Sequence, residues 1–203
     1  NRAMKLHQVF FFLLLVFLPT QLGFHFWPEW ALVLGRRIDY LAPTLYLTDI
    51  LVLLTVGSWF VENKLKAQSS KLKSNPKSKI QIILFGIPFL IFAFLNILFA
   101  SSPPVAIYAW VKVLEYILLG FYIFKTHPPL SSTIFFLSIG VFYSSMITIA
   151  QFFLQRSIGG PLWWLGERTF TSQTPGIAQF PLDLGLKLRP YATFPHPNVL
   201  AGF

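Results

Sequence analysis

Long apolar runs constrain this chain more than any other feature of its sequence. They cover residues 6–22, 45–61, 80–100, 105–124 and 131–155. A helix needs roughly 20 mostly apolar residues to cross the hydrocarbon core of a bilayer. Charged residues make up only 11% of the chain, whereas soluble domains carry about 25%. We therefore predict an all-α fold, a polytopic transmembrane helical bundle.

The two ends of the sequence suggest a part of a longer chain. The sequence starts with Asn1 rather than methionine, and a sixth apolar run begins at Val199 and is cut short at Phe203. A complete span needs roughly 20 residues. We therefore expect residues 1–203 to form the N-terminal part of one transmembrane domain, with five complete spans and the start of a sixth.

Lysines set the expected orientation in the membrane. Six of them lie in the polar segment 62–79, and loops rich in lysine and arginine favour the cytoplasmic side. We therefore expect 62–79 to be a cytoplasmic basic loop, solvated and without secondary structure. Alternation of the spans then places the N-terminus in the cytoplasm and the segments 23–44 and 156–197 outside it.

Arginine is concentrated in the segments that are expected outside. Five of the six basic residues there are arginines, whereas the expected cytoplasmic side carries mostly lysines. A guanidinium group binds phosphate through two parallel hydrogen bonds, which an ammonium group does not. The pattern predicts an anionic ligand on the outer face, and pairing with lipid headgroup phosphates stays open as an alternative. The basic residues concerned are Arg36, Arg37, Arg156, Arg168, Lys187 and Arg189.

The segment 189–198 is the strongest candidate for a binding site. Its three prolines exclude a regular helix, because proline lacks an N–H donor and has a fixed φ. Pro197 suits the first position of a following helix, and the free N–H groups of a helix start bind anions. With Arg189 and His196 close by, we predict a phosphate or pyrophosphate site at a membrane surface. A proline-rich re-entry loop whose arginine meets lipid headgroups is the alternative.

Ionisable residues within the apolar runs suggest a second kind of site. Asp49, Lys112 and Glu115 lie in or beside predicted spans, where charges are costly and often functional. Lys112 and Glu115 stand three residues apart and therefore share one helix face. A structural ion pair and a path for ions or protons both fit this pattern.

The sequence offers little support for other chemistry. It contains no cysteine and no spacing typical of metal ligands, of a glycine-rich phosphate loop or of a nucleophile elbow, so no metal and no cofactor are expected. His196 is a candidate general base, although no carboxylate stands near it in the sequence. The net charge of +9 lies mostly where the orientation rule places it, so nucleic acid is not an expected partner.

The segment from Arg189 to Gly202, RPYATFPHPNVLAG, resembles the signature that opens the conserved core of the O-antigen ligase and O-antigen polymerase superfamily. Residues 18–23, 37–49 and 110–116 are similar to N-terminal stretches of such proteins. The sequence departs from the pattern at Ala192, where many members have glycine. The resemblance implies a polytopic, multi-pass protein of the bacterial cytoplasmic (inner) membrane.

The resemblance also implies an activity. Members transfer a glycan from an undecaprenyl pyrophosphate carrier to a glycan or glycolipid acceptor, as ligase or polymerase, on the outer face of the membrane and without a metal. Arg189 then corresponds to the arginine that holds the pyrophosphate, and His196 and Asn198 to polar positions beside the helix start. Arg36 and Arg37 are further substrate-binding candidates on the outer face. The catalytic base is expected beyond residue 203.

Two other functions fit the same residues. A transporter or flippase for lipid-linked or anionic solutes would use the outer arginines as an entry site, with Asp49, Lys112 and Glu115 as its coupling path. A structural membrane subunit would carry no chemistry at all. A transporter should depend on the intramembrane charges, whereas a transferase should depend on Arg189.

Overall fold

The computed structural model describes the backbone of residues 4–69, 76–182 and 185–203, and the side chains of these residues except 66–85. The chain divides into two compact units. The first unit comprises Asn1–Phe24, Thr44–Thr55 and His127–Phe203, and the second comprises His25–Pro43 and Val56–Thr126. Each unit is described by itself below.

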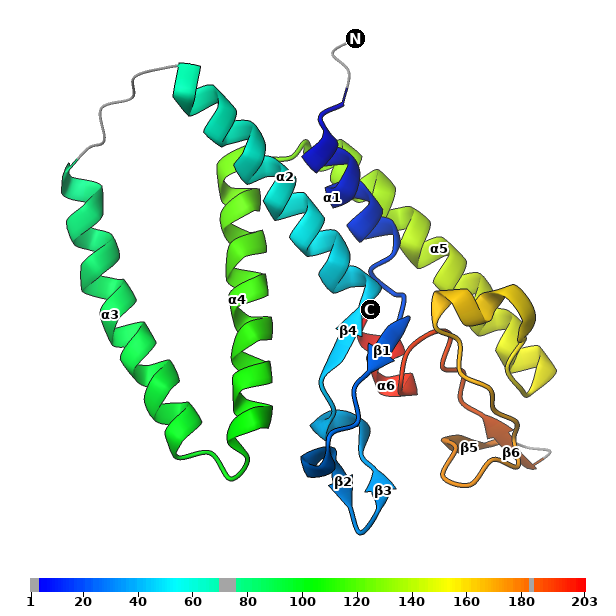
Figure 1. The fold of residues 1–203 in the computed structure, drawn as a ribbon. Coiled ribbons are helices and arrows are strands. Elements are labelled where there is room, and N and C mark those ends of the chain that lie inside the picture. The colour runs from blue at the N-terminus through cyan, green and yellow to red at the C-terminus, as the bar shows by residue number, and fades with distance from the viewer. Residues whose placement is uncertain (1–3, 70–75, 183–184) are drawn as a thin grey trace. The chain divides into compact units, whose positions relative to one another are not determined.

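Two helices, α1 (Leu6–Val16) and α5 (Leu130–Leu154), pack along each other in the first unit (Figure 1). Gly140 permits this close approach, because a Cβ atom at that position would lie 2.9 Å from the carbonyl oxygen of Val16. Helix α1 ends before Pro19, whose ring disfavours helical backbone in the preceding residue. Helix α5 ends at Gln155, which adopts a left-handed conformation with φ of 53°.

The remainder of the first unit consists of short elements. After α5 come the 3₁₀ helix η3 (Gly160–Leu165), the antiparallel strands β5 (Gln179–Leu182) and β6 (Gly185–Leu188), and the short helix α6 (Pro197–Gly202). Strand β1 (Gly23–His25) pairs with β4 (Thr44–Tyr46), directly before α2. The predicted binding segment 189–198 runs from the end of β6 into the start of α6.

The second unit contains a helical hairpin and a β-hairpin. Helices α3 (Pro76–Leu98) and α4 (Pro103–Thr126) run antiparallel (Figure 1) and are in contact. The indole N–H of Trp110 donates a hydrogen bond of 3.1 Å to the side-chain oxygen of Asn96, which joins the two helices. The β-hairpin is formed by β2 (Leu32–Val33) and β3 (Arg36–Arg37) between the 3₁₀ turns η1 (Glu29–Ala31) and η2 (Asp39–Leu41). Helix α2 (Leu47–Ser69) begins in the first unit and ends in the second.

The prediction of five complete spans is wrong. Among the described residues, only α4 and α5 are long and apolar enough to cross a membrane. Helix α1 has 11 residues and is about 17 Å long at 1.5 Å per residue, whereas the hydrocarbon core is about 30 Å thick. Helix α2 becomes polar towards its end, from Glu62 onwards, and the apolar stretch described for α3 is the short Gly86–Leu98.

The prediction of an all-α fold is also wrong. Residues 23–44 and 156–197, expected as loops, contain short strands in two-stranded sheets. The basic segment 62–79 is not a loop throughout, because α2 extends to Ser69 and α3 begins at Pro76. Lysine, glutamate and glutamine are good helix formers, so a helix continues past the apolar run that nucleates it. The prediction for residues 70–75 lies outside the described residues.

Exposure distinguishes α4 and α5 from the core helices of a soluble protein. In the most apolar 18-residue window of each helix, only 6% of α4 and 17% of α5 is buried. Large apolar side chains therefore face outwards along both helices, and soluble proteins rarely expose continuous apolar surfaces of this kind. Length, composition and exposure together indicate association with a membrane.

Candidate functional site

The structure brings three of the predicted site residues together. Arg189 follows β6, where its backbone N–H donates a hydrogen bond of 3.0 Å to the carbonyl of Ala178. Its Nη2 atom donates a hydrogen bond of 3.0 Å to the Oδ1 atom of Asn198, at the start of α6. The side-chain Nδ1 atom of His196 accepts a hydrogen bond of 3.1 Å from the backbone N–H of Asn198. Arg189, His196 and Asn198 therefore form one connected cluster.

The start of α6 does not supply the free donors expected of an anion site. Pro197 is the first helical residue, as predicted, and has no N–H. The N–H of Asn198 is capped by His196, and the N–H groups of Val199 and Leu200 bond to the carbonyl of His196. The positive charge at this site therefore comes from the Arg189 guanidinium.

His196 acts as a helix cap in this structure. Because its Nδ1 atom accepts the hydrogen bond from Asn198, the neutral ring carries its proton on Nε2. The free ring nitrogen is then a donor, and the lone pair that a general base would use is already engaged. His196 is exposed and can offer its Nε2–H group to an anionic ligand.

An open, mostly apolar groove of about 390 Å³ lies beside Arg189. Helix α5 contributes Phe152, and strand β5 contributes Phe180, whose rings stack with centroids 6.4 Å apart. A groove of this kind accepts an apolar chain, while the positive charge of Arg189, one of its lining residues, attracts a negative charge. The residues that line it are Thr148, Phe152, Phe180, Arg189, Pro190, Pro197, Leu200 and Ala201.

A buried amide holds the backbone that follows Arg189. The side chain of Gln151, on α5, is 0% exposed. Its Oε1 atom accepts hydrogen bonds from the backbone N–H groups of Tyr191 and Ala192, at 3.0 and 2.7 Å. Its Nε2 atom donates to the carbonyl of Ala192 at 3.0 Å and to Oε1 of Glu167 at 2.8 Å. All four hydrogen-bonding positions of the amide are therefore used.

Glu167 connects this amide to the loop after α5. Its side chain is 4% exposed. Its Oε1 atom accepts a hydrogen bond of 2.7 Å from the N–H of Ile158, and its Oε2 atom one of 2.7 Å from the N–H of Gly159. Burial of a carboxylate is tolerated when hydrogen bonds replace its water. We call Gln151 and Glu167 the polar hub. Sequence reasoning missed both residues, although a glutamine inside the apolar run 131–155 was an available signal.

Two further features fix the segment after Arg189. The hydroxyl of Thr193 donates a hydrogen bond to the carbonyl of Pro19, which ties the segment to the end of α1. Ala192 is buried and has a φ of 48°, a region that glycine adopts most readily.

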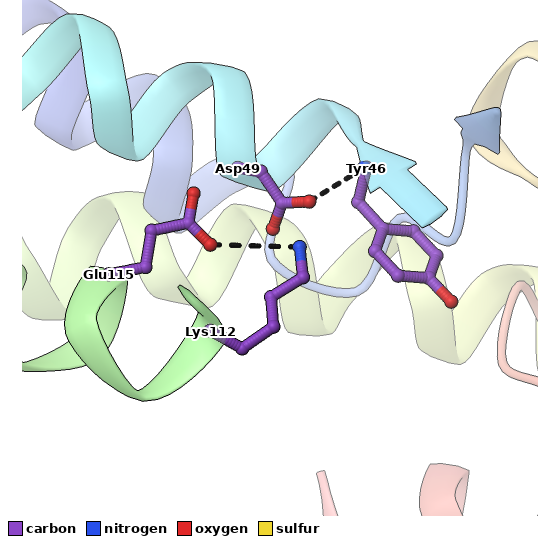
Figure 2. A network of polar contacts seen from close by, with 4 residues as sticks. All are labelled: Tyr46, Asp49, Lys112 and Glu115. Atoms are coloured by element: carbon purple, nitrogen blue, oxygen red, sulfur yellow. Dashed lines mark hydrogen bonds and ion pairs between the residues drawn. The ribbon is translucent and has the colours of Figure 1, made fainter. Parts of the chain in front are cut away.

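The other predicted site residues belong to other elements of the chain. Arg36 and Arg37 belong to β3, in the second unit, where both are exposed. Lys112 and Glu115 form an ion pair of 3.6 Å on α4 (Figure 2), so the prediction that they share a helix face is confirmed. Asp49, in the first unit, accepts a hydrogen bond of 2.8 Å from the N–H of Tyr46 (Figure 2) and so caps the start of α2.

Within the part of the chain that the structure describes, no group of three or more histidine, cysteine or acidic side chains could hold a metal ion. Comparison with known proteins adds no relative: no family model, no curated protein and no solved structure matches this chain. The cluster around Arg189 and the groove beside it are therefore the features of the chain that bear on its function.

Proposed function

We propose that this protein binds a polyprenyl pyrophosphate-linked glycan donor and takes part in glycan transfer to an acceptor, as a ligase or polymerase resembling the O-antigen enzymes. One observation carries the proposal: Arg189 lines an open, mostly apolar groove. A lipid-linked pyrophosphate has the matching chemistry, with an apolar chain next to a strong anion.

The surroundings of Arg189 favour an anion with several oxygens. A guanidinium has five N–H donors in a planar fork, and the hydrogen bond to Asn198 orients this fork from one nitrogen. The other donors suit bidentate contacts with phosphate oxygens. Transfer of the glycan releases the pyrophosphate carrier, so a fixed positive charge lowers the barrier by stabilising the charge on the leaving group. Such an enzyme needs no metal for this step.

The proposal includes a location, the bacterial cytoplasmic membrane. In this arrangement α5 crosses the bilayer and residues 156–197 lie on the outer side, where lipid-linked glycans are used. Lys125, at the end of α4, then lies on the cytoplasmic side, where lysine is favoured.

The activity is tested in cells that lack the gene for this protein. Lipid-linked and surface glycans are extracted and compared before and after complementation with the wild type, Arg189→Lys or Arg189→Gln. A ligase predicts long chains on the carrier and none on the surface, whereas a polymerase predicts single repeat units. The wild type should restore transfer, and both variants should fail, since lysine lacks the planar fork. Full restoration by both variants would contradict the proposal.

The transporter alternative is tested with the ion pair on α4. The pair is internal to one helix, and replacing both Lys112 and Glu115 by methionine removes its two opposite charges together. A transferase should tolerate this double substitution with unchanged surface glycan. If the double variant lost surface glycan while Arg189→Gln kept it, the coupling path of a transporter would be favoured instead.

A further inference from the structure

The β-hairpin of the second unit ends in a turn that folding does not explain. Strands β2 and β3 pair Leu32 with Arg37 and Val33 with Arg36. The turn between them consists of Leu34 and Gly35, with φ of 51° and 75°. Positive φ at both positions is typical of a tight hairpin turn, for which Asn-Gly and Asp-Gly are preferred. We call residues 32–37 the arginine hairpin.

Leu34 occupies the least suitable position of this hairpin for an apolar side chain. It is 98% exposed, so its whole side chain meets solvent at the tip. Its left-handed backbone conformation is also unfavourable for a residue with a bulky side chain. Asparagine at this position would avoid both the exposure of an apolar side chain and the unfavourable backbone conformation. A residue that costs stability in the isolated fold points to a contact outside it.

The neighbours of Leu34 combine apolar and cationic groups. Val33 is exposed, and Arg36 and Arg37 on the opposite strand are exposed as well. The guanidinium of Arg37 lies 5.3 Å from the ring centroid of Trp27, a cation–π geometry that holds this arginine in place. The hairpin itself contains no acidic residue. The tip of the hairpin is therefore a small apolar surface, formed by Val33 and Leu34, that adjoins the positive charges of Arg36 and Arg37.

We propose that the arginine hairpin docks on the phosphate-bearing surface of an anionic bilayer. Leu34 and Val33 enter the interfacial layer, and Arg36 and Arg37 bind lipid phosphates. Tryptophan favours this depth, so Trp27 stabilises the same arrangement. The inference does not depend on glycan transfer or on the groove beside Arg189, since it concerns a different unit of the chain.

The size of the tip favours a lipid surface over a protein partner. A stable protein interface buries about 800 Å² on each side, which the tip of a hairpin of six residues does not provide. A bilayer requires no matching shape, and arginine near an anionic surface is attracted electrostatically. Two exposed arginines complement its charge directly.

The test uses a fluorescent reporter on the full chain. The protein has no cysteine, so Val33→Cys carries a single NBD label in nanodiscs made of zwitterionic or anionic lipid. Spin-labelled lipid quenches the label inside the interface, and iodide quenches it in water. In anionic nanodiscs we expect quenching by spin-labelled lipid and protection from iodide. Replacing both Arg36 and Arg37 by glutamine should lower the docked population on the order of tenfold.

Leu34→Asn is the decisive second variant, because asparagine suits the turn and keeps the hairpin folded. In the same labelled background it should lower the docked population on the order of tenfold, the factor that burial of one leucine side chain provides. Leu34→Met should keep docking. Equal iodide quenching with leucine and asparagine at this position would overturn the proposal. Protection from both quenchers would also overturn it, since it would indicate a second copy of the chain or another protein surface.

Discussion

The side-chain amide of Gln151 donates a hydrogen bond of 2.8 Å to the carboxylate of Glu167, and both side chains are almost completely buried. Through this contact, the Gln151 side chain, on a candidate transmembrane helix, is connected to two separate segments, one directly and one through Glu167. Gln151 binds the backbone that follows Arg189, and Glu167 binds the loop after α5. Buried hydrogen bonds from Gln151, and not local turns alone, therefore fix the position of the backbone that follows Arg189.

We expect Gln151→Leu to destabilise the first unit strongly. The substitution leaves the backbone N–H groups of Tyr191 and Ala192 and the carbonyl of Ala192 without their partner, and it removes one hydrogen bond of Glu167. Each buried unsatisfied group costs about 1–3 kcal/mol, so a total of about 3 kcal/mol or more is expected. Thermal unfolding in detergent measures it. Gln173→Leu, at an exposed turn, is the control and should change stability by less than about 0.5 kcal/mol. Equal losses of thermal stability in the two variants would show that the hydrogen bonds of the polar hub do not contribute to stability as expected.

Gly140→Ala should weaken the packing of α1 against α5. The added Cβ atom would lie 2.9 Å from the carbonyl of Val16 and 3.2 Å from that of Leu15, and relief of such overpacking costs about 1–3 kcal/mol. Gly120→Ala, on α4, has no atom within 4 Å of the new Cβ and should be neutral or stabilising by up to about 1 kcal/mol. Unfolding midpoints of the two variants measure the difference, and a stable Gly140→Ala protein would contradict the observed closeness of the helices.

Thr193→Val should loosen the link between the Arg189 segment and the end of α1. Valine keeps the shape of threonine but leaves the buried carbonyl of Pro19 without its donor, at a cost of about 1–3 kcal/mol. Thr193→Ser keeps the hydroxyl and should lose much less. Hydrogen exchange at residues 191–194 reports the loosening locally. If serine and valine accelerated exchange to the same extent, packing rather than the hydrogen bond would hold this link.

His196→Asn separates a capping role from a catalytic one. Asparagine is among the best N-cap residues and can replace the acceptor that His196 offers to the N–H of Asn198, but it cannot act as a base near neutral pH. We expect His196→Asn to retain most glycan transfer, and His196→Ala to lose part of it through disorder of α6. Transfer is measured in the complemented cells described above. Complete loss in both variants, with α6 intact, would restore His196 as a catalytic candidate.

The apolar runs predicted where most helices lie, but they did not predict which of these helices are able to cross a membrane. Helix α4 occupies Pro103–Thr126 and α5 Leu130–Leu154, within one or two residues of the runs 105–124 and 131–155. The run 6–22 failed as a span because α1 ends at Val16, shortly before Pro19. A hydropathy pattern counts apolar residues, whereas a span also needs unbroken hydrogen bonding over its whole length.

The candidate site was predictable only where it is local in sequence. Arg189, His196, Pro197 and Asn198 lie within ten residues. Their proximity in the sequence was therefore enough to predict that they belong to one site. Gln151 contacts a backbone about 40 residues later, and no local pattern encodes such a contact. The hairpin at 32–37 was missed because Leu34 stands where the usual turn signal would be asparagine or aspartate.

The most direct test of the central claim measures binding at the groove beside Arg189. Purified protein in nanodiscs is titrated with a polyprenyl pyrophosphate, the matching polyprenol and inorganic pyrophosphate. We predict that the lipid pyrophosphate binds best, and that both Arg189→Gln, which removes the charge, and Ala201→Trp, which fills the groove, weaken it at least about tenfold, as expected for the loss of one charge-assisted contact. Equal binding of polyprenol and polyprenyl pyrophosphate, unaffected by both variants, would contradict the account.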